Sequence, residues 1–235
     1  MSSFLKPIRH LSHSRRGVSK FSVVLFVLGL VVAAGIFLYQ ANLNSQNEEL
    51  SKAPTGHRKN APYIVSPKDV IDLMLSVSDL DSDDVIYDLG CGDGRIVITA
   101  AKQFGCRGVG YEYDEELAEL ARQRVKEAGV EDLVTIKQMD IFKISKAEMN
   151  EASVITLYLL DWMNKKLIPQ LRELDDGKVI VSHDWGLNRI EPDRIEKIQS
   201  KDDPERKEHV VHVWVTPLKS EPPDPAAGKD DSGSP

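Results

Sequence analysis

Short apolar runs and longer stretches with a helical period alternate along the middle of this chain. Runs rich in Val, Ile and Leu are typical of buried strands, whereas apolar residues that recur about every 3.6 positions are typical of amphipathic helices. The runs predict strands over residues 85–89, 106–112, 133–136, 152–160, 178–185 and 210–215. Strands that alternate with helices predict a mostly parallel sheet with helices on both faces.

The helical stretches lie between these strands. One helix is predicted over Arg95–Phe104, and another follows Asp114, which is a good N-cap residue. Upstream of the first strand, Ser66 is the expected N-cap of a further helix. A helix over 161–174 contains Pro169, which must kink or interrupt it. The expected fold class is therefore α/β, a doubly wound Rossmann-like sheet with an antiparallel strand or hairpin at its C-terminal end.

Three glycines, Gly90, Gly92 and Gly94, directly follow the first predicted strand and precede its helix. Glycines there let the backbone turn tightly and approach a ligand closely. A dinucleotide site requires a small residue where Arg95 stands, and its strand would be apolar where Asp88 stands. The run Asp-Leu-Gly-Cys-Gly-Asp-Gly instead resembles the first motif of class I S-adenosylmethionine (SAM) methyltransferases, which implies SAM as the cofactor.

Two acids follow the next two strands. Glu112 ends the second strand, 22 residues after Gly90, where an acid can accept both ribose hydroxyls of an adenosine. In the family that the glycine run resembles, an acid at Asp140 takes the adenine amino group and apolar neighbours such as Ile141 flank the ring. The alternative is that both are loop acids that only keep the strand ends in contact with solvent and bind no ligand.

The second half of the domain is expected to hold the methyl acceptor, because ligands sit beyond the carboxyl ends of the strands in open α/β sheets. Tyr158 should border the transferred methyl, and Trp162 and Trp185 are further aromatic candidates. His183 is the candidate general base by residue type. Asp161 or Asp184 is a candidate to orient an amine. Tyr158, His183 and Asp184 are the expected catalytic residues, and the alternative for His183 is a strand-end histidine bonded to backbone.

Four segments together resemble a narrower group: Pro-Tyr-Ile-x-Ser-Pro, the glycine run with its flanks, Thr-Leu-Tyr-Leu-Leu and Val-Ser-His-Asp. This group is the small bacterial SAM-dependent methyltransferases that look related to the mitochondrial lysine methyltransferases of the ATP synthase c subunit and the adenine nucleotide translocase. By that resemblance Tyr63 is expected to close over the methionine part of SAM, and the alternative is that it is an aromatic staple for the first helix. The expected cofactor-binding residues are Tyr63, Asp88, Gly90, Cys91, Gly92, Gly94, Glu112, Asp140 and Ile141.

Composition divides the chain into a methyltransferase domain and flanking segments. Residues 21–39 carry no charge and span roughly 28 Å as a helix, close to the thickness of a bilayer core. We therefore expect a single membrane anchor, with a cleaved signal peptide as the alternative. The expected layout is a basic segment 1–20, a transmembrane helix 21–39, a linker 40–62, the domain 63–219 and a disordered tail 220–235.

Two opposing arguments bear on the orientation of the anchor. Five Lys and Arg residues precede residues 21–39 and three follow them within the linker, so the positive-inside rule places the N-terminus in the cytoplasm and the domain outside. SAM is made in the cytosol, so a working transferase should face that side. We expect a single-pass membrane protein with a cytosol-facing domain.

These observations favour a membrane-anchored methyltransferase that acts on a protein lysine. The alternatives are a small-molecule or lipid-type methyltransferase and a non-catalytic SAM-binding protein. A net charge of −7 without a basic stripe argues against a nucleic-acid partner. No Cys and His set has metal-ligand spacing, so no metal is expected.

Overall fold

The computed structural model describes residues 63–206 and 208–220, together with the isolated Ala34. The predicted basic segment, the transmembrane helix (apart from Ala34), the linker and most of the tail lie outside the described residues. Within the described part of the chain, no helix is both long and apolar enough to cross a membrane.

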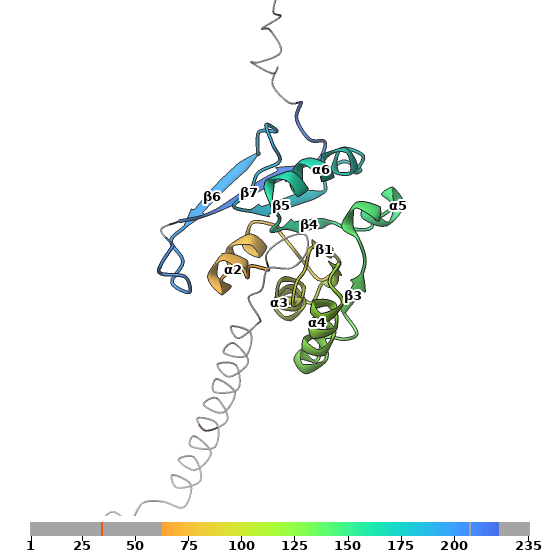
Figure 1. Cartoon of the computed structure of the whole chain (residues 1–235), viewed down its shortest axis with the longest axis vertical. Coiled ribbons are helices and arrows are strands. Elements are labelled where there is room, and N and C mark those ends of the chain that lie inside the picture. The colour runs from red at the N-terminus through yellow and green to blue at the C-terminus, as the bar shows by residue number, and fades with distance from the viewer. Residues whose placement is uncertain (1–33, 35–62, 207, 221–235) are drawn as a thin grey trace, which may run out of the picture. The chain divides into compact units, whose positions relative to one another are not determined.

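Seven strands form one mixed sheet in the order β3-β2-β1-β4-β5-β7-β6 (Figure 1). Strands β1 to β5 are parallel, and β7 pairs antiparallel with both β5 and β6. The central strand β1 is buried at every position, as expected for a strand covered on both faces. The strands are β1 Val85–Leu89, β2 Arg107–Glu112, β3 Val134–Gln138, β4 Val154–Leu157, β5 Val179–His183, β6 Arg194–Ile198 and β7 His209–Val215.

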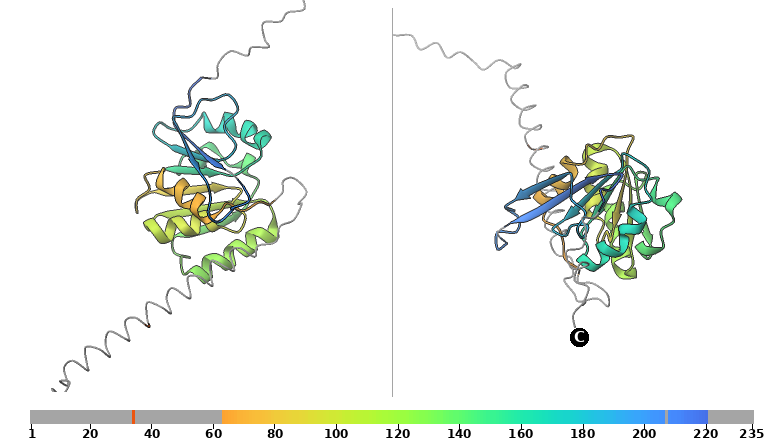
Figure 2. Two further views of the ribbon diagram at one scale, coloured as in Figure 1. Left: turned by 90° about the vertical axis from the view of Figure 1, so that its left-hand side faces the viewer. Right: turned by 90° about the horizontal axis from the view of Figure 1, so that it is seen from above.

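Helices cover both faces of this sheet (Figure 2). One apolar cluster joins the sheet to α2, α3 and α4, and a second joins it to α5 and α6. The chain reverses its direction of winding between β1 and β4, which are neighbours in the sheet but distant in sequence. This switch point is where open α/β sheets bind ligands. The helices are α2 Lys68–Ser76, α3 Arg95–Phe104, α4 Glu115–Ala128, the 3₁₀ turn η1 Ile141–Lys143, α5 Lys146–Met149 and α6 Asp161–Leu171.

The predicted α/β architecture is confirmed, and so is one cap. The Asp114 carboxylate accepts hydrogen bonds from the backbone N–H groups of Glu116 and Leu117, both at 3.0 Å, which satisfies two donors in the first turn of α4. The predicted Ser66 cap is wrong, because Pro67 takes the N-cap position of α2 and makes no side-chain cap bond. The Ser66 hydroxyl instead lies 2.9 Å from His183 Nδ1.

Two further details of the sequence prediction need correction. The helix over 161–174 ends at Leu171, and Pro169 is accommodated inside it. Strand β6 was not predicted as a separate element. Three of its five residues are charged, and none of the five is fully buried at the sheet edge, so the apolar signal is weak.

Candidate cofactor and acceptor site

One large cavity lies at the carboxyl ends of the parallel strands. Its volume is about 1170 Å³, which exceeds the range of about 300–1,000 Å³ for small-molecule sites and leaves room for a cofactor and part of an acceptor. Eight of the nine residues expected to bind the cofactor line this cavity; the ninth, Gly94, lies at the N-terminus of α3. The eight are Tyr63, Asp88, Gly90, Cys91, Gly92, Glu112, Asp140 and Ile141.

The glycine loop, residues 90–94, forms a cradle that side chains would fill. Gly92 has a φ of +54°, and a Cβ there would lie 2.4 Å from Cε2 of Tyr63. Gly90 has a φ of +86°, and its Cβ would lie 2.7 Å from Cδ2 of Leu159. Only glycine fits such a conformation and such close neighbours. A cofactor can therefore approach the backbone of the loop closely at Gly90 and Gly92. N–H groups of the loop are already bound within the protein: Gly90 and Cys91 donate to the Tyr111 carbonyl, and Gly94 donates to the Cys91 carbonyl.

Asp88 lies at the base of this cavity. The side chain is 2 % exposed, and its Oδ1 accepts a hydrogen bond of 2.8 Å from the Thr156 hydroxyl. Burial raises the pKa of Asp88 to about 7, and the nearby Glu112 and Asp93 add to the rise while Thr156 opposes it. A carboxylate that is costly to ionise alone is stabilised when a cationic group binds beside it. Asp88 thus fits the ammonium or sulfonium side of SAM.

Glu112 and Asp140 reach the cavity from the ends of β2 and β3. The Glu112 carboxylate accepts hydrogen bonds from the N–H groups of Gly92 at 2.9 Å and Asp114 at 2.8 Å. These bonds fix the carboxylate against the glycine loop, and each oxygen keeps further acceptor capacity for a ribose hydroxyl. The Asp140 side chain caps η1 by accepting from the N–H of Phe142 at 3.1 Å. Both acids are placed where the sequence predicted, and their cofactor contacts stay predictions.

An ion-pair cluster beneath the loop was not among the predicted site residues. Asp93 is 1 % exposed and is bound by the guanidinium groups of Arg95, at 2.7 Å, and Arg124. Burial alone would raise the pKa of Asp93, but the hydrogen bond and charge of Arg95, together with Arg124, hold it below its usual value. Arg95 Nη1 also donates to the Ser66 carbonyl at 3.3 Å. The cluster therefore connects the glycine loop, α4 and the segment that carries Tyr63. The Gly-Asp-Gly-Arg run offered a signal for Asp93 and Arg95, but none for Arg124.

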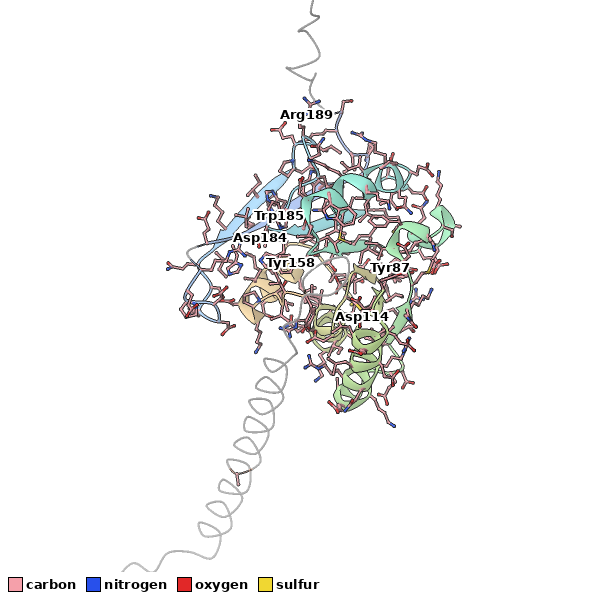
Figure 3. All side chains as sticks on the ribbon, in the orientation of Figure 1. Tyr87, Asp114, Tyr158, Asp184, Trp185 and Arg189 are labelled. Carbon is pink, nitrogen blue, oxygen red and sulfur yellow. The ribbon has the colours of Figure 1, made fainter. Side chains whose placement is uncertain are left out.

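Aromatic side chains line the other part of the cavity, which we call the acceptor wall: Tyr158, Trp162 and Trp185. Trp162 is 49 % exposed and Trp185 47 %, so large apolar surfaces are left open at this rim. Tyr158 follows β4 and Trp185 follows β5, and their side chains lie in the same region of the molecule (Figure 3). The sequence prediction of an aromatic acceptor region is consistent with this placement.

His183 and Asp184 lie behind the acceptor wall rather than on the cavity surface. His183 is fully buried, and its ring stacks on Tyr158 with 4.0 Å between ring centroids. Burial lowers the pKa of His183 to about 4; Asp184 opposes that fall, while His209 and Arg206 add to it. Asp184 Oδ2 lies 2.8 Å from Nη1 of Arg206. Neither residue is among those that line the cavity, so the structure gives His183 no direct path to an acceptor.

His183, Asp184 and His209 also form a compact group, with one potential metal-ligand atom from each within 4.8 Å of the others. Sequence spacing did not reveal it, because β5 and β7 bring the residues together. The Arg206 guanidinium already binds the Asp184 carboxylate and places a positive charge beside it. That charge disfavours a metal ion at this position. The absence of a metal stays a prediction.

The sheet order, the glycine loop at its switch point and the acid after β2 define a class I SAM-dependent methyltransferase. Residues 88–194 match the family described as the ANTKMT methyltransferase domain. A protein-lysine N-methyltransferase of Saccharolobus islandicus is 34 % identical over 158 residues, which cover 66 % of this chain and 94 % of that protein. The chain belongs to this methyltransferase family, and its cofactor is SAM.

Two other relatives differ in the acceptor that their names give. A crystal structure of an RNA methyltransferase from Salinibacter ruber in complex with S-adenosyl-L-homocysteine is 45 % identical, with a TM-score of 0.60, and covers 68 % of this chain and 98 % of that one. The mouse lysine N-methyltransferase of the ATP synthase c subunit is 34 % identical over 109 residues, 46 % of this chain. The match spans only 42 % of the mouse protein.

Proposed function

We propose that this enzyme transfers methyl groups from SAM to a lysine side chain of a protein. The observation that carries the proposal is the charge of the cavity. The residues that line the cavity include seven with carboxyl side chains and two with cationic side chains, Arg95 and Lys166. Arg95 and Asp93 neutralise each other in an ion pair, which leaves six other carboxyl groups and one other cation, Lys166, in the lining. The lining therefore offers little to attract a phosphate backbone. The seven carboxylates are those of Asp88, Asp93, Glu112, Asp114, Glu115, Glu116 and Asp140.

The acceptor wall suits an amine that must react in its neutral form. A lysine ammonium has a reference pKa of about 10.4, and removal from water disfavours its charged state. The net negative charge of the cavity lining attracts the ammonium as it approaches, and the aromatic surfaces of Trp162 and Trp185 then desolvate it. SAM supplies an already activated methyl group, so holding the amine in line accounts for much of the expected acceleration.

The names of the relatives give two acceptors, a protein lysine and RNA. The Saccharolobus islandicus protein matches over nearly its whole length and is named a protein-lysine N-methyltransferase. The Salinibacter ruber structure has higher identity and carries the name of an RNA methyltransferase. Aromatic side chains also stack on unpaired bases, so RNA is the second candidate acceptor. The scarcity of cations in the cavity lining favours the protein lysine.

The proposal is tested by following methyl label into fractions of a native extract. The full-length chain, purified in detergent, is added with methyl-labelled SAM to a membrane extract of the native cell that lacks the gene. We expect a discrete labelled band that protease removes and ribonuclease leaves intact, and no band with Asp88→Ala. Label that ribonuclease removes would assign an RNA acceptor. Label only in the solvent-extractable fraction would assign a lipid or small molecule, and binding of SAM without transfer would favour a non-catalytic protein.

We also propose, separately, that residues 21–39 anchor the enzyme in a membrane with its domain in the cytosol. The support is the sequence alone: 19 consecutive uncharged residues of suitable length. Two separate samples test this proposal. Native membranes are extracted with alkaline carbonate, and intact cells are treated with protease from outside. An anchored, cytosol-facing domain stays in the pellet and survives the protease. Release by carbonate, or digestion from outside, would contradict the proposal.

A further inference from the structure

His183 is held at both ring nitrogens inside the protein. Nδ1 lies 2.9 Å from the Ser66 hydroxyl oxygen, and Nε2 lies 2.9 Å from Nδ1 of His209. Ser66 precedes α2 and His209 opens β7, so the imidazole joins three segments that are far apart in sequence. A ring engaged in this way is fixed in position, and neither nitrogen is directed at the cavity.

The face of this imidazole supports Tyr158. The two rings are stacked, with centroids 4.0 Å apart and planes inclined by 30°. Tyr158 lines the cavity, whereas His183 does not, so Tyr158 is the layer between the histidine and the acceptor. A displacement of the imidazole would therefore change where the tyrosine ring stands. Small displacements of a reacting group's partners reduce rates strongly.

The carboxylate of Asp184 acts on the same tyrosine through its charge. Its backbone is left-handed, with a φ of +63°, a conformation that costs free energy for a residue other than glycine. Hydrogen bonds to Val210 keep it there: the Asp184 N–H donates to the Val210 carbonyl at 2.6 Å, and the Val210 N–H donates to Asp184 Oδ1 at 3.2 Å. Burial, followed by the Asp184 carboxylate, raises the pKa of Tyr158, so its hydroxyl is neutral in the working enzyme.

We propose that His183 is a positioning residue, which with Ser66 and His209 holds Tyr158 so that its hydroxyl oxygen accepts a hydrogen bond from the acceptor amine. This inference rests on the proposed lysine acceptor. It assigns the contact with the substrate to Tyr158 and no proton transfer to His183. The amine then presents its lone pair to the methyl group in a fixed direction.

A double-mutant cycle tests whether His183 acts through the Tyr158 hydroxyl. Four forms of the full chain are compared in the labelling assay: wild type, His183→Gln, Tyr158→Phe and the double variant. Phe keeps the stacked ring and removes only the hydroxyl. We expect each single variant to lower kcat by at least about fivefold, and the double variant to match Tyr158→Phe within about twofold, because contacting residues are non-additive. SAM affinity by calorimetry should change little in all forms.

Several results would overturn the inference. Tyr158→Phe with wild-type kcat would show that the hydroxyl is not used, and equal losses from His183→Gln in both backgrounds would show that His183 acts independently of it. Loss of one ionisation from the pH profile of kcat in His183→Gln would make the histidine a general base. His212→Gln is the matched control, since His212 also contacts Asp184 but does not stack on Tyr158, and its kcat should stay within about twofold of wild type.

Folding defects and failure of the proposed function are distinguished by two further measurements. Ser66→Ala leaves the imidazole in place and removes only its Nδ1 partner, so it should lower kcat in the wild-type background and not in Tyr158→Phe. Melting curves identify any variant that does not fold. If wild type labels no protein lysine, the proposed function fails. If wild type labels lysine and the cycle is additive, only the role of His183 fails.

Discussion

The Asp88 carboxylate is buried at the switch point of the sheet and is bound by the hydroxyl of Thr156 on the neighbouring strand, at 2.8 Å. Burial and the nearby carboxylates raise its pKa from 3.8 to about 7. A carboxyl with a raised pKa binds its proton more tightly in the folded state. Ionisation of Asp88 therefore lowers the free energy of unfolding as pH rises above 4, and this loss reaches its full size above pH 7.

Asp88→Asn should consequently stabilise the protein without cofactor while weakening SAM binding. The amide oxygen can still accept from Thr156, and the cost of burying a charge is gone. We expect about 2–4 kcal/mol of added stability at pH 8 and almost none near pH 4, from the size of the pKa change. Urea unfolding at the two pH values, with calorimetry of SAM, measures both effects. A variant that is less stable at pH 8, or that binds SAM normally, would contradict this role.

Gly92→Ala should abolish tight SAM binding because the new Cβ meets the Tyr63 ring at 2.4 Å. Gly177→Ala is the matched control, since Gly177 also has a positive φ, of +85°, but nothing lies within 4 Å of its added Cβ. Both variants should lose about 1–2 kcal/mol of stability from the left-handed backbone. Only Gly92→Ala should lose SAM affinity, by at least about tenfold. Equal SAM affinities of the two variants would disprove the collision with Tyr63.

The ion pairs of Asp93 with Arg95 and Arg124 should matter far more than an exposed pair. Asp93→Asn leaves two largely buried guanidinium groups with a neutral partner, so we expect a loss of about 3–5 kcal/mol. Glu119→Gln, which breaks the exposed pair with Arg122, should cost less than about 0.5 kcal/mol. Folding lowers the pKa of Asp93. Its contribution to the free energy of unfolding is therefore present above pH 4 and is lost as pH falls through the pKa of the folded state. Unfolding at pH 7 and pH 3 tests the size and the direction, and a small loss at pH 7 would refute the cluster's importance.

Acid should destabilise the protein partly through His183. Its pKa falls from 6.5 to about 4 on folding, so the unfolded chain binds the extra proton more tightly. This effect is absent above pH 6.5. As pH falls to 4, it lowers the free energy of unfolding by about 2–3 kcal/mol. His183→Gln, which has no such proton to bind, should lose less stability than wild type over this interval. Parallel curves for the two proteins would contradict the buried neutral histidine.

The sequence allowed the cofactor half of the site to be predicted because its chemistry is local. The glycine loop follows β1, Glu112 ends β2 and Asp140 comes two residues after β3, so their place at one edge of the sheet follows from strand order. The cap at Asp114 is likewise a contact between near neighbours. The acceptor half depends on pairs that no local pattern contains. Ser66 and His183 are 117 positions apart, and β7 has to add to β5 before His209 can reach His183.

The same distinction explains the assignment of His183. By residue type it is a natural general base, and a strand end is a reasonable place for one. Only the packed structure reveals that Tyr158 lies between the imidazole and the cavity and that both ring nitrogens are engaged. Edge strand β6 was difficult for a different reason: two isoleucines among three charged residues carry little apolar signal.

The most direct test of a lysine acceptor is the chemical identity of the methylated product. Protein labelled by the full-length enzyme and methyl-labelled SAM is hydrolysed to its components, which are separated by chromatography beside standards. We expect the label to migrate with ε-N-methylated lysine and to be absent when Asp88→Ala replaces the wild type. Label that migrates with a methylated nucleoside, or with a methylated amino acid other than lysine, would contradict it.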